Sequence, residues 1–334
     1  MDYKRKAEEL VALMTVEEKA GLCSGASSWY LKGVPRLGLS PVMVTDGPHG
    51  LRKQNESDLG LSQKKTVPAT CFPTASLTSC SFDRELLREI GQAIGEECRA
   101  EGVAVLIGPG MNIKRSPLCG RNFEYFCEDP MLSGELAAAF TEGVQSRGVG
   151  VSLKHFAMNN QETRRLIIES TADERAMREI YLSGFERAVR KASPWTVMCS
   201  YNKISGEYAS ENKKLLTDIL RSEWGFDGLV MSDWGAVSDR VSALRAGLDL
   251  EMPGPCPVND ARLVSAAQDS ADDMAALDKA ARNVTRLLLR AAAAQKRGYD
   301  AGAHHALARL ERELGGEVLV VTQNVDDLHE RAGS

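Results

Sequence analysis

The sequence has few of the residues that build metal and phosphate sites. It contains five histidines, and its eight cysteines are scattered without a Cys-x-x-Cys pair or a His-rich segment, so no metal-ligand spacing is present. Long runs of Lys and Arg are absent and the net charge is −5, which argues against nucleic acid as a partner. No Gly-x-Gly-x-x-Gly follows the first predicted strand, which argues against a dinucleotide-binding fold. We therefore expect neither a metal nor a cofactor.

A long apolar run is also missing. No run approaches the roughly 20 residues that cross a bilayer, so we expect no membrane span. Residues 1–6 are charged and lead into an amphipathic helix, unlike a signal peptide. We therefore expect a cytoplasmic protein whose cysteines are reduced. A disulfide between Cys119 and Cys127 is the alternative in an oxidising setting.

Apolar and amphipathic segments alternate along the 334 residues. Short apolar runs predict strands at residues 42–45, 103–107, 150–155, 196–200, 228–232 and 247–252. Periodic segments predict helices at residues 4–14, 82–101, 132–147, 171–191, 211–224, 236–246 and 259–297. The patterns at 15–18 and 171–174 predict capping boxes. Such alternation with short connections is typical of parallel βαβ units.

Polar side chains follow nearly every predicted strand. They are Asp46, the loop 115–124, Lys154 with His155, Ser200 to Asn202, Asp233 with Trp234, and Glu251. The carboxyl ends of barrel strands converge on one mouth, whereas a doubly wound sheet gathers its ligand at one switch point. We therefore predict an α/β fold with a TIM-type (β/α)8 barrel, regular or irregular, and a short C-terminal helix–strand extension. A doubly wound sheet is the alternative.

Asp233 directly follows the apolar run 228–232 and precedes Trp234. A carboxylate at a strand end can be a nucleophile, a metal ligand or a base, or it can simply cap a helix. Charged groups such as Arg52, Arg121 and Glu124 bind hydroxyls well, and an indole packs against the C–H face of a sugar. Each residue alone has a structural explanation. Together, at successive strand ends, they favour a site for a polyhydroxylated ligand.

Five motifs occur in one order along the chain. They are DGPHGLR at 46–52, GRNFE at 120–124, KHFAMNNQE at 154–162, MCSYN at 198–202 and SDW at 232–234. Together they resemble the first domain of glycoside hydrolase family 3, in its β-glucosidase branch, over about residues 1–305. The resemblance implies a retaining enzyme that acts on a small β-glucoside or oligosaccharide.

The resemblance implies a catalytic nucleophile at Asp233. It also implies a set of sugar-binding residues: Asp46 for the distal hydroxyls, Arg121, Lys154 and His155 for the ring hydroxyls, Tyr201 beside the nucleophile, and Trp234 facing the sugar. Glu124 would orient Arg121 rather than touch the substrate. We expect the nearby cations to keep Asp233 ionised, as a nucleophile must be.

A retaining glycosidase also needs a second carboxyl about 5–5.5 Å from the first. In β-glucosidases of this family the resemblance places it on an α/β-sandwich domain after the barrel, which this sequence does not contain. A single-domain branch uses a His-containing acid/base in the loop after the Lys-His motif. That loop reads NNQETRR at 159–165, without the histidine, and Glu162 resembles scaffold more than an acid. We therefore expect impaired hydrolysis; a non-catalytic sugar-binding remnant is the alternative.

Residues 310–334 resemble a different family. They read as a helix, an apolar strand at 318–321 and the motif TQNVD at 322–326, which resembles the NAD-binding core of sirtuins. Gln323, Asn324 and Asp326 match positions near the nicotinamide ribose there, but the sirtuin phosphate loop and catalytic histidine are missing, so an NAD-binding protein is the weakest candidate. We divide the chain into a barrel at 1–300 and a foreign tail at 301–334, from a truncated or recombined gene. A genuine extension packed on the barrel is the alternative.

Overall fold

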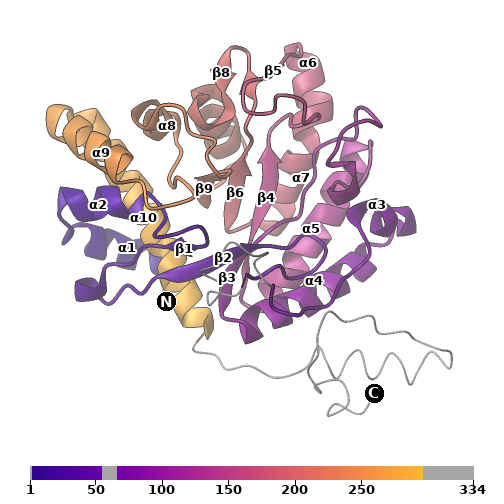
Figure 1. Ribbon diagram of the computed structural model, residues 1–334, viewed down its shortest axis with the longest axis horizontal. Helices are drawn as coiled ribbons and strands as arrows, with labels where there is room; N and C mark the ends of the chain where they lie inside the picture. Colours follow the sequence, from indigo (N-terminus) through magenta and orange to yellow (C-terminus); the bar gives the residue numbers. More distant parts are fainter. Residues whose placement is uncertain (1, 55–65, 296–334) are drawn as a thin grey trace.

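A computed structural model describes residues 2–54 and 66–295. Six strands form one curled sheet in the order β1-β2-β3-β4-β6-β9, with the helices around it (Figure 1). These strands are β1 (Tyr30–Leu31), β2 (Val42–Asp46), β3 (Val103–Ile107), β4 (Gly150–Phe156), β6 (Thr196–Cys199) and β9 (Leu229–Ser232). All neighbours are parallel except β1 and β2. The predicted strand ends at 103–107 and 228–232 are therefore confirmed within one residue.

Isolated bridges close the sheet into a circuit. Leu250 pairs with Met231 of β9, Glu251 pairs with Ser24, and Gly25 pairs with Leu31 of β1. A Cβ atom on Gly254 would lie 1.7 Å from the carbonyl oxygen of Gly25, so only glycine permits this approach. The fold is thus a TIM-type α/β barrel, as predicted, but irregular. The predicted strand 247–252 contributes bridges only, and β1 runs antiparallel to its neighbour.

The helices cover the outside of the barrel. They are α1 (Tyr3–Val11), α2 (Val16–Leu22), α3 (Ala75–Thr78), α4 (Arg84–Ala100), α5 (Pro130–Ser146), α6 (Glu174–Ala176), α7 (Ser183–Ala192), α8 (Arg240–Ala246), α9 (Pro257–Asp269) and α10 (Ala271–Gln295). Short 3-10 turns are η1 (Pro35–Leu37), η2 (Ser79–Ser81), η3 (Asn122–Glu124) and η5 (Ala209–Glu211), and π-helical segments are η4 (Met177–Leu182) and η6 (Lys214–Glu223). A small sheet of β5 (Glu169–Ser170), β7 (Lys203–Ile204) and β8 (Glu207–Tyr208) lies apart from the barrel sheet. In the part of the chain that is described, no helix is both long and apolar enough to span a membrane.

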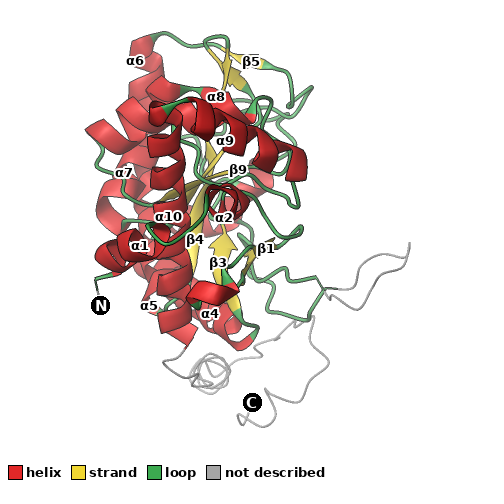
Figure 2. Cartoon of the chain, turned by 90° about the vertical axis from the view of Figure 1, so that its left-hand side faces the viewer, coloured by secondary structure: helices red, strands yellow, loops and turns green. Residues whose placement is uncertain are grey.

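Two apolar layers hold helices and sheet together. Ile94 of α4, Phe140 of α5 and Phe185 of α7 belong to one buried cluster with strand residues of the barrel. Val11 of α1 and Leu288 of α10 belong to a second cluster with β2 and β3. Helices α1 and α10 therefore pack side by side, as Figures 1 and 2 show, so the first and last described helices close the barrel together.

The observed helix ends confirm one of the two predicted capping boxes and contradict the other. The capping box at 15–18 is confirmed, with the Glu18 amide donating to Thr15 Oγ1 at 3.2 Å and the Thr15 amide donating to Glu18 Oε2 at 2.9 Å. The box at 171–174 is wrong, because Asp173 caps that helix by accepting from the Ala176 amide at 2.8 Å. The helix at 259–297 is in fact two helices. Ser270 is extended (φ −142°, ψ 125°) between them and accepts from the Asp273 amide.

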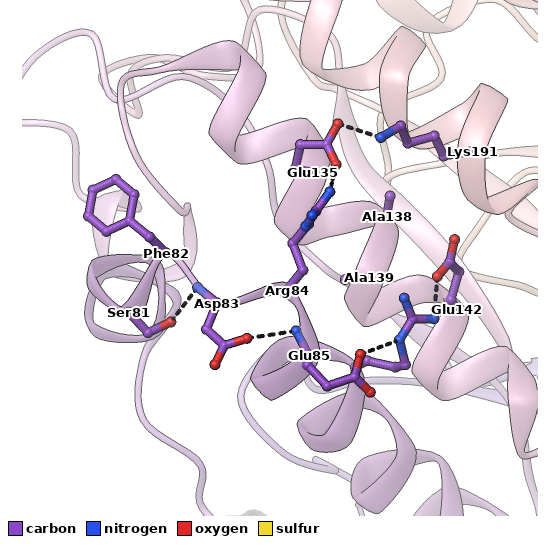
Figure 3. A pocket seen from close by; sticks show the side chains of 11 residues that line it. Ser81, Phe82, Asp83, Arg84, Glu85, Glu135, Ala138, Ala139, Glu142 and Lys191 are labelled. Atoms are coloured by element: carbon purple, nitrogen blue, oxygen red, sulfur yellow. Dashed lines mark hydrogen bonds and ion pairs between the residues drawn. The ribbon is translucent and has the colours of Figure 1, made fainter.

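All eight cysteines are free thiols, so the alternative of a Cys119–Cys127 disulfide is wrong for this structure. The predicted tail at 301–334, its strand at 318–321 and the barrel boundary near residue 300 lie outside the described residues. A charged groove of about 760 Å³ lies on the outer face between α4, α5 and α7 (Figure 3). It is lined by residues such as Arg84, Glu135 and Lys191, and by none of the predicted site residues.

Candidate active site

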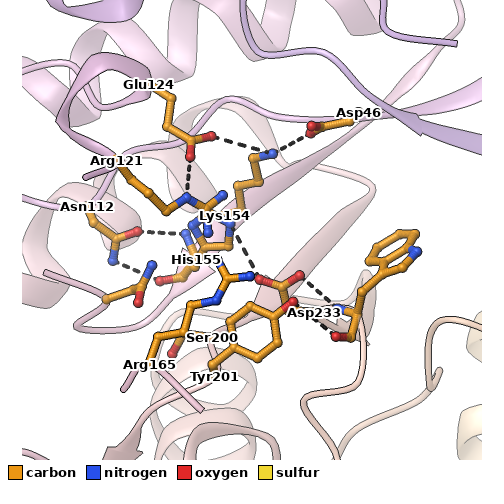
Figure 4. A network of polar contacts seen from close by, with 12 residues as sticks. Asp46, Asn112, Arg121, Glu124, Lys154, His155, Arg165, Ser200, Tyr201 and Asp233 are labelled. Carbon is orange, nitrogen blue, oxygen red and sulfur yellow. Dashed lines mark hydrogen bonds and ion pairs between the residues drawn. The ribbon is translucent and has the colours of Figure 1, made fainter. Parts of the chain in front are cut away.

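The predicted site residues lie together at the carboxyl ends of the barrel strands (Figure 4). Asp46 is the last residue of β2, Lys154 and His155 lie near the end of β4, and Asp233 directly follows β9. Arg121 comes from the loop after β3, and Tyr201 and Trp234 follow β6 and β9. Parallel strands end at the same edge of a sheet, so residues up to 188 positions apart in the chain share one site.

Buried ion pairs line one side of the site. Lys154 Nζ lies 2.6 Å from Asp46 Oδ1 and 3.7 Å from Glu124 Oε2, and the Lys154 side chain is 3 % exposed. The other oxygen of Glu124 accepts from Arg121 Nε, so Glu124 lies between two cations. Burial alone would raise the pKa of Asp46, but the charge and hydrogen bond of Lys154 outweigh it and lower that pKa. Asp46 is therefore held as a carboxylate that can accept from hydroxyls.

Asp233 has one satisfied and one unsatisfied oxygen. Its Oδ1 accepts from the Trp234 amide at 2.7 Å, whereas Oδ2 is buried with no hydrogen-bond partner in the described chain. Burial raises the pKa of Asp233, against the opposing effects of the Trp234 amide, Arg121 and Lys154. The cations act in the expected direction and favour the ionised form of Asp233, but desolvation is the larger effect on its pKa. Oδ2 remains the atom able to attack an electrophile.

His155 is fixed from three sides. Its backbone amide donates to Asn112 Oδ1, and its carbonyl accepts from Asn112 Nδ2, both at 2.8 Å. Its Nδ1 lies 3.0 Å from the Tyr125 hydroxyl, and its Nε2 lies 3.6 Å from Asp233 Oδ2. Burial, together with Arg121 and Lys154, holds the pKa of His155 well below 6.5. The ring is therefore neutral and supplies hydrogen bonds rather than charge.

Two indoles form an apolar wall beside Asp233. The rings of Trp29 and Trp234 lie 5.2 Å apart between centroids. Trp234 Nε1 donates to the Ser28 carbonyl at 2.9 Å, and Tyr201 donates its hydroxyl to the Trp234 carbonyl at 3.0 Å. The orientation of Trp234 is thus set from both its side chain and its backbone, which suits a flat surface for a sugar ring.

The structure adds residues that sequence reasoning missed and removes one that it proposed. The Arg165 guanidinium lies 4.6 Å from the centroid of the Tyr201 ring, at the edge of the site (Figure 4). The only sequence signal for it was its place in the loop after the Lys-His motif. Glu251 turns away from the site, since Asn259 Nδ2 donates to it at 2.8 Å and Arg240 lies 3.7 Å away. Arg52 stays at the rim, 3.7 Å from Asp46 Oδ2.

This geometry defines a class of site. At the mouth of an α/β barrel, a carboxylate oxygen with no hydrogen-bond partner among the described residues lies 3.6 Å from a neutral imidazole, with two cations and an indole wall nearby. These groups suit a carboxylate nucleophile beside a polyhydroxylated ligand. In residues 2–54 and 66–295, no group of three His, Cys, Asp or Glu is arranged to hold a metal.

The chain belongs to glycosyl hydrolase family 3, because the model of that family's N-terminal domain matches residues 54–287. A second model, described as Sir2 family, matches residues 262–334. The two matches overlap in α9 and α10, whose buried Leu263 and Leu277 pack in a core cluster with α2 and α8. The described part of that overlap is therefore part of the barrel fold.

Named relatives agree with the family. Thermostable beta-glucosidase B of Acetivibrio thermocellus is 54 % identical over 323 residues, which are 96 % of this chain and 42 % of that protein. An exo-alpha-(1->6)-L-arabinopyranosidase of Bifidobacterium longum is 50 % identical over 317 residues, which are 94 % of this chain and 41 % of that protein. The chain thus spans about two fifths of the length of these relatives.

Solved structures share the fold. The structure of beta-glucosidase 3B from Thermotoga neapolitana in complex with α-D-glucose matches with a TM-score of 0.82 and 40 % identity, covering 90 % of this chain and 46 % of that one. A GH3 beta-glucosidase from Bifidobacterium adolescentis matches with a TM-score of 0.81 and 48 % identity, covering 89 % and 43 %. These sequence identities are above the level at which a structural likeness indicates a shared fold alone.

Proposed function

We propose that this chain carries the nucleophile and the sugar-binding groups of a retaining β-glucosidase, with Asp233 as the nucleophile. The observation that carries the proposal is Asp233 Oδ2, a buried oxygen with no hydrogen-bond partner among the described residues. Arg121 and Lys154 favour its ionised form electrostatically. A solved neighbour of 40 % identity holds glucose, which supports a glucose-sized ligand here.

The proposed reaction begins with attack of Asp233 Oδ2 on the anomeric carbon. The glycosidic bond breaks, its electron pair leaves with the aglycone oxygen, and a covalent glycosyl ester forms with inversion. The transition state resembles an oxocarbenium ion, so the carboxylate also stabilises the charge as it develops. Water then attacks the same carbon, gives up one proton to the solvent and releases Asp233 as a carboxylate, which restores the original configuration. Asp46, Lys154 and Arg121 would hold the hydroxyls, and Trp234 would face the ring.

The carboxylates around Asp233 are poorly suited to protonate the leaving oxygen. Asp46 pairs with Lys154, Glu124 with Arg121, and Glu162 with Arg165. Each of these three carboxyls is thus engaged by a cation rather than available to the leaving oxygen. We infer that glucosides with acidic leaving groups react fastest with this chain, and that alkyl glucosides react slowly or not at all.

The proposal is tested with 2,4-dinitrophenyl β-glucoside, whose leaving group needs little protonation. We expect turnover, and with the corresponding 2-fluoro sugar we expect a covalent adduct on the peptide that contains Asp233. Asp233→Gly should abolish both. Asp269→Gly is the matched control, because Asp269 is exposed at the end of α9. Full turnover by Asp233→Gly would refute the assignment.

Three other outcomes point to other functions. Binding of glucose without turnover of any activated glycoside would identify a sugar-binding remnant. Faster turnover of the α-L-arabinopyranoside, whose ring lacks the hydroxymethyl group of glucose, would follow the relative named for that activity. The Sir2 family match makes an NAD-binding protein the third candidate. We expect NAD to cause no thermal shift, and a shift would favour that candidate.

We also propose that the barrel ends near residue 300, with residues 301–334 as a separate tail. The family 3 match ends at residue 287, whereas the Sir2 match continues to residue 334. Limited proteolysis should cut after the last residues of α10 and leave a barrel fragment that still reacts at Asp233.

We also propose a cytoplasmic location. The eight free thiols support it, because cysteines stay reduced in the cytosol.

A further inference from the structure

A chain of polar contacts leads from the rim of the site to the proposed nucleophile. Its links are Arg165 Nη1 to Glu162 Oε2 at 2.9 Å, Asn159 Nδ2 to Glu162 Oε1 at 3.1 Å, Asn159 Nδ2 to the Tyr125 hydroxyl at 3.0 Å, that hydroxyl to His155 Nδ1 at 3.0 Å, and His155 Nε2 to Asp233 Oδ2 at 3.6 Å. Tyr125, Asn159 and His155 are each at most 1 % exposed. The direction of each hydrogen bond is therefore decided within the protein.

The outer half of the chain sets the direction of the Tyr125 proton. An ionised carboxylate can only accept, so Glu162 requires the amide nitrogen of Asn159 to face it. The same nitrogen then donates its second proton to the Tyr125 oxygen. This orientation leaves Asn159 Oδ1 buried with no hydrogen-bond partner in the part of the chain that the structure describes, so Asn159 makes both donations while its acceptor oxygen stays unsatisfied. With its oxygen accepting, Tyr125 is free to donate its own proton to His155 Nδ1.

The inner half of the chain requires the same arrangement. A neutral imidazole carries one proton, so a His155 that accepts at Nδ1 carries the proton at Nε2. That proton then faces Asp233 Oδ2. The other tautomer would direct the Nε2 lone pair at a carboxylate, which is repulsive. The contacts on both sides of His155, with Tyr125 and with Asp233, therefore select the same tautomer, the one with its proton on Nε2.

We propose that Tyr125, oriented through Asn159 and Glu162, is a positioning residue that holds neutral His155 as the Nε2–H tautomer. His155 then presents a hydrogen-bond donor, rather than a lone pair, to Asp233 and to a sugar hydroxyl beside it. The consequence for catalysis rests on the proposed function. The tautomer itself does not, because it is a property of the free protein.

The test is the pair of ring-nitrogen resonances of His155 in ¹⁵N NMR of the full chain, assigned with His155→Gln. We expect Nε2 to be protonated and Nδ1 to accept a hydrogen bond in the wild type. In Tyr125→Phe we expect the Nδ1 resonance to move toward that of an imidazole nitrogen with no donor. Tyr208→Phe is the control, because Tyr208 lies in the small sheet and packs beside Lys203. A wild-type proton on Nδ1, or an Nδ1 resonance that Tyr125→Phe leaves in place, would overturn the proposal.

Glu162→Gln tests the outer half of the chain and keeps the shape of the side chain. The introduced amide can donate to Asn159, so Asn159 can turn its oxygen toward both that amide and the Tyr125 hydroxyl. The Tyr125 hydroxyl would then donate to Asn159 instead of to His155 Nδ1. We therefore expect a population of His155 that carries its proton on Nδ1. An unchanged tautomer would overturn the role of Glu162 and Asn159 in this orientation.

Reactivity gives a separate readout. We expect Tyr125→Phe to slow labelling of Asp233 by the activated 2-fluoro glucoside by about tenfold, the effect of about one lost hydrogen bond, while its unfolding curve stays cooperative and shows a folded protein under the labelling conditions. If no protein is labelled, the proposed function fails while the nitrogen resonances still decide the tautomer. If the wild type is labelled and Tyr125→Phe is labelled equally fast, the positioning role fails while the proposed function stands.

Discussion

The molecule has two clusters of Lys, Arg and Glu that share their chemistry and differ in burial. At the barrel mouth, Lys154 and Glu124 are 3 % and 6 % exposed (Figure 4). In the outer groove, Lys191 is 44 % exposed and Glu135 is 13 % exposed (Figure 3). Glu135 takes contacts from three cations, including Arg84 and Arg187. The groove has a volume of about 760 Å³, but its charged side chains form ion pairs with one another.

The comparison shows why only one cluster makes a chemical site. Water and salt screen exposed pairs, whose contribution to stability is typically below about 1 kcal/mol. Buried pairs are costly to desolvate and act strongly on their neighbours. At the mouth, Lys154 lowers the pKa of Asp46 and opposes the burial that raises the pKa of Asp233. A groove of charges is therefore not sufficient; the charges must be buried and one acceptor must be left unpaired.

The largest expected effect is that of Lys154→Met. It leaves half-buried Asp46 and buried Glu124 without this cation, which should lower the free energy of unfolding by about 3–5 kcal/mol. The folded-state pKa of Asp46 is lowered below its ordinary 3.8, so its contribution to stability is present above that value and is lost as the pH falls through the folded pKa. In urea unfolding, the difference from the wild type should therefore narrow at acidic pH. A difference below about 1 kcal/mol at neutral pH would mean that burial does not distinguish the two clusters.

Much of the mouth could be predicted from the sequence because its signals are local. The apolar runs before Asp46 and Asp233 are short and end at polar residues, so a buried strand and its end can be predicted without tertiary information. Parallel pairing then brings those ends together. The motif resemblance added roles to residues that the apolar runs had already placed at strand ends.

The remaining features depend on contacts between distant residues. Asn159 donates to the Tyr125 hydroxyl, 34 positions earlier in the sequence, and that hydroxyl contacts His155. Neither Tyr125 nor Asn159 lies in a periodic pattern that would indicate this contact. Glu251 follows an apolar run like the others, but its side chain faces α8 and α9 rather than the mouth. Of the segments that close the barrel through isolated bridges, 247–252 has an apolar run that predicts a strand, whereas Ser24 and Gly25 lie outside every predicted strand. The sign of the Asp233 pKa shift also needed the structure, since desolvation is not visible in a list of nearby charges.

A smaller effect concerns the pH dependence of labelling. Asp233 must be ionised to attack, so the rate should fall as the pH falls through its raised pKa. Arg121 opposes that rise and is 17 % exposed. In Arg121→Met the pKa of Asp233 should rise further, so the acid limb of the labelling rate should move to higher pH. Arg84→Met in the outer groove is the control and should leave the limb in place. The measured quantity is the pH at which the labelling rate falls to half, because lost contacts to the sugar also lower the maximum rate. A limb that stays in place in Arg121→Met would show that Arg121 does not act on Asp233.

The smallest effect is expected for Lys191→Met, the same substitution as Lys154→Met but in the outer groove. Glu135 keeps Arg84 and Arg187 after the change, and the lost pair is exposed, so the free energy of unfolding should fall by less than about 1 kcal/mol. Added salt separates the two variants, because ions screen an exposed pair and reach a buried one poorly. The Lys191→Met difference should shrink in about 1 M NaCl, whereas that of Lys154→Met should persist. Equal salt sensitivity of the two variants would mean that solvent reaches the mouth pairs as freely as the groove.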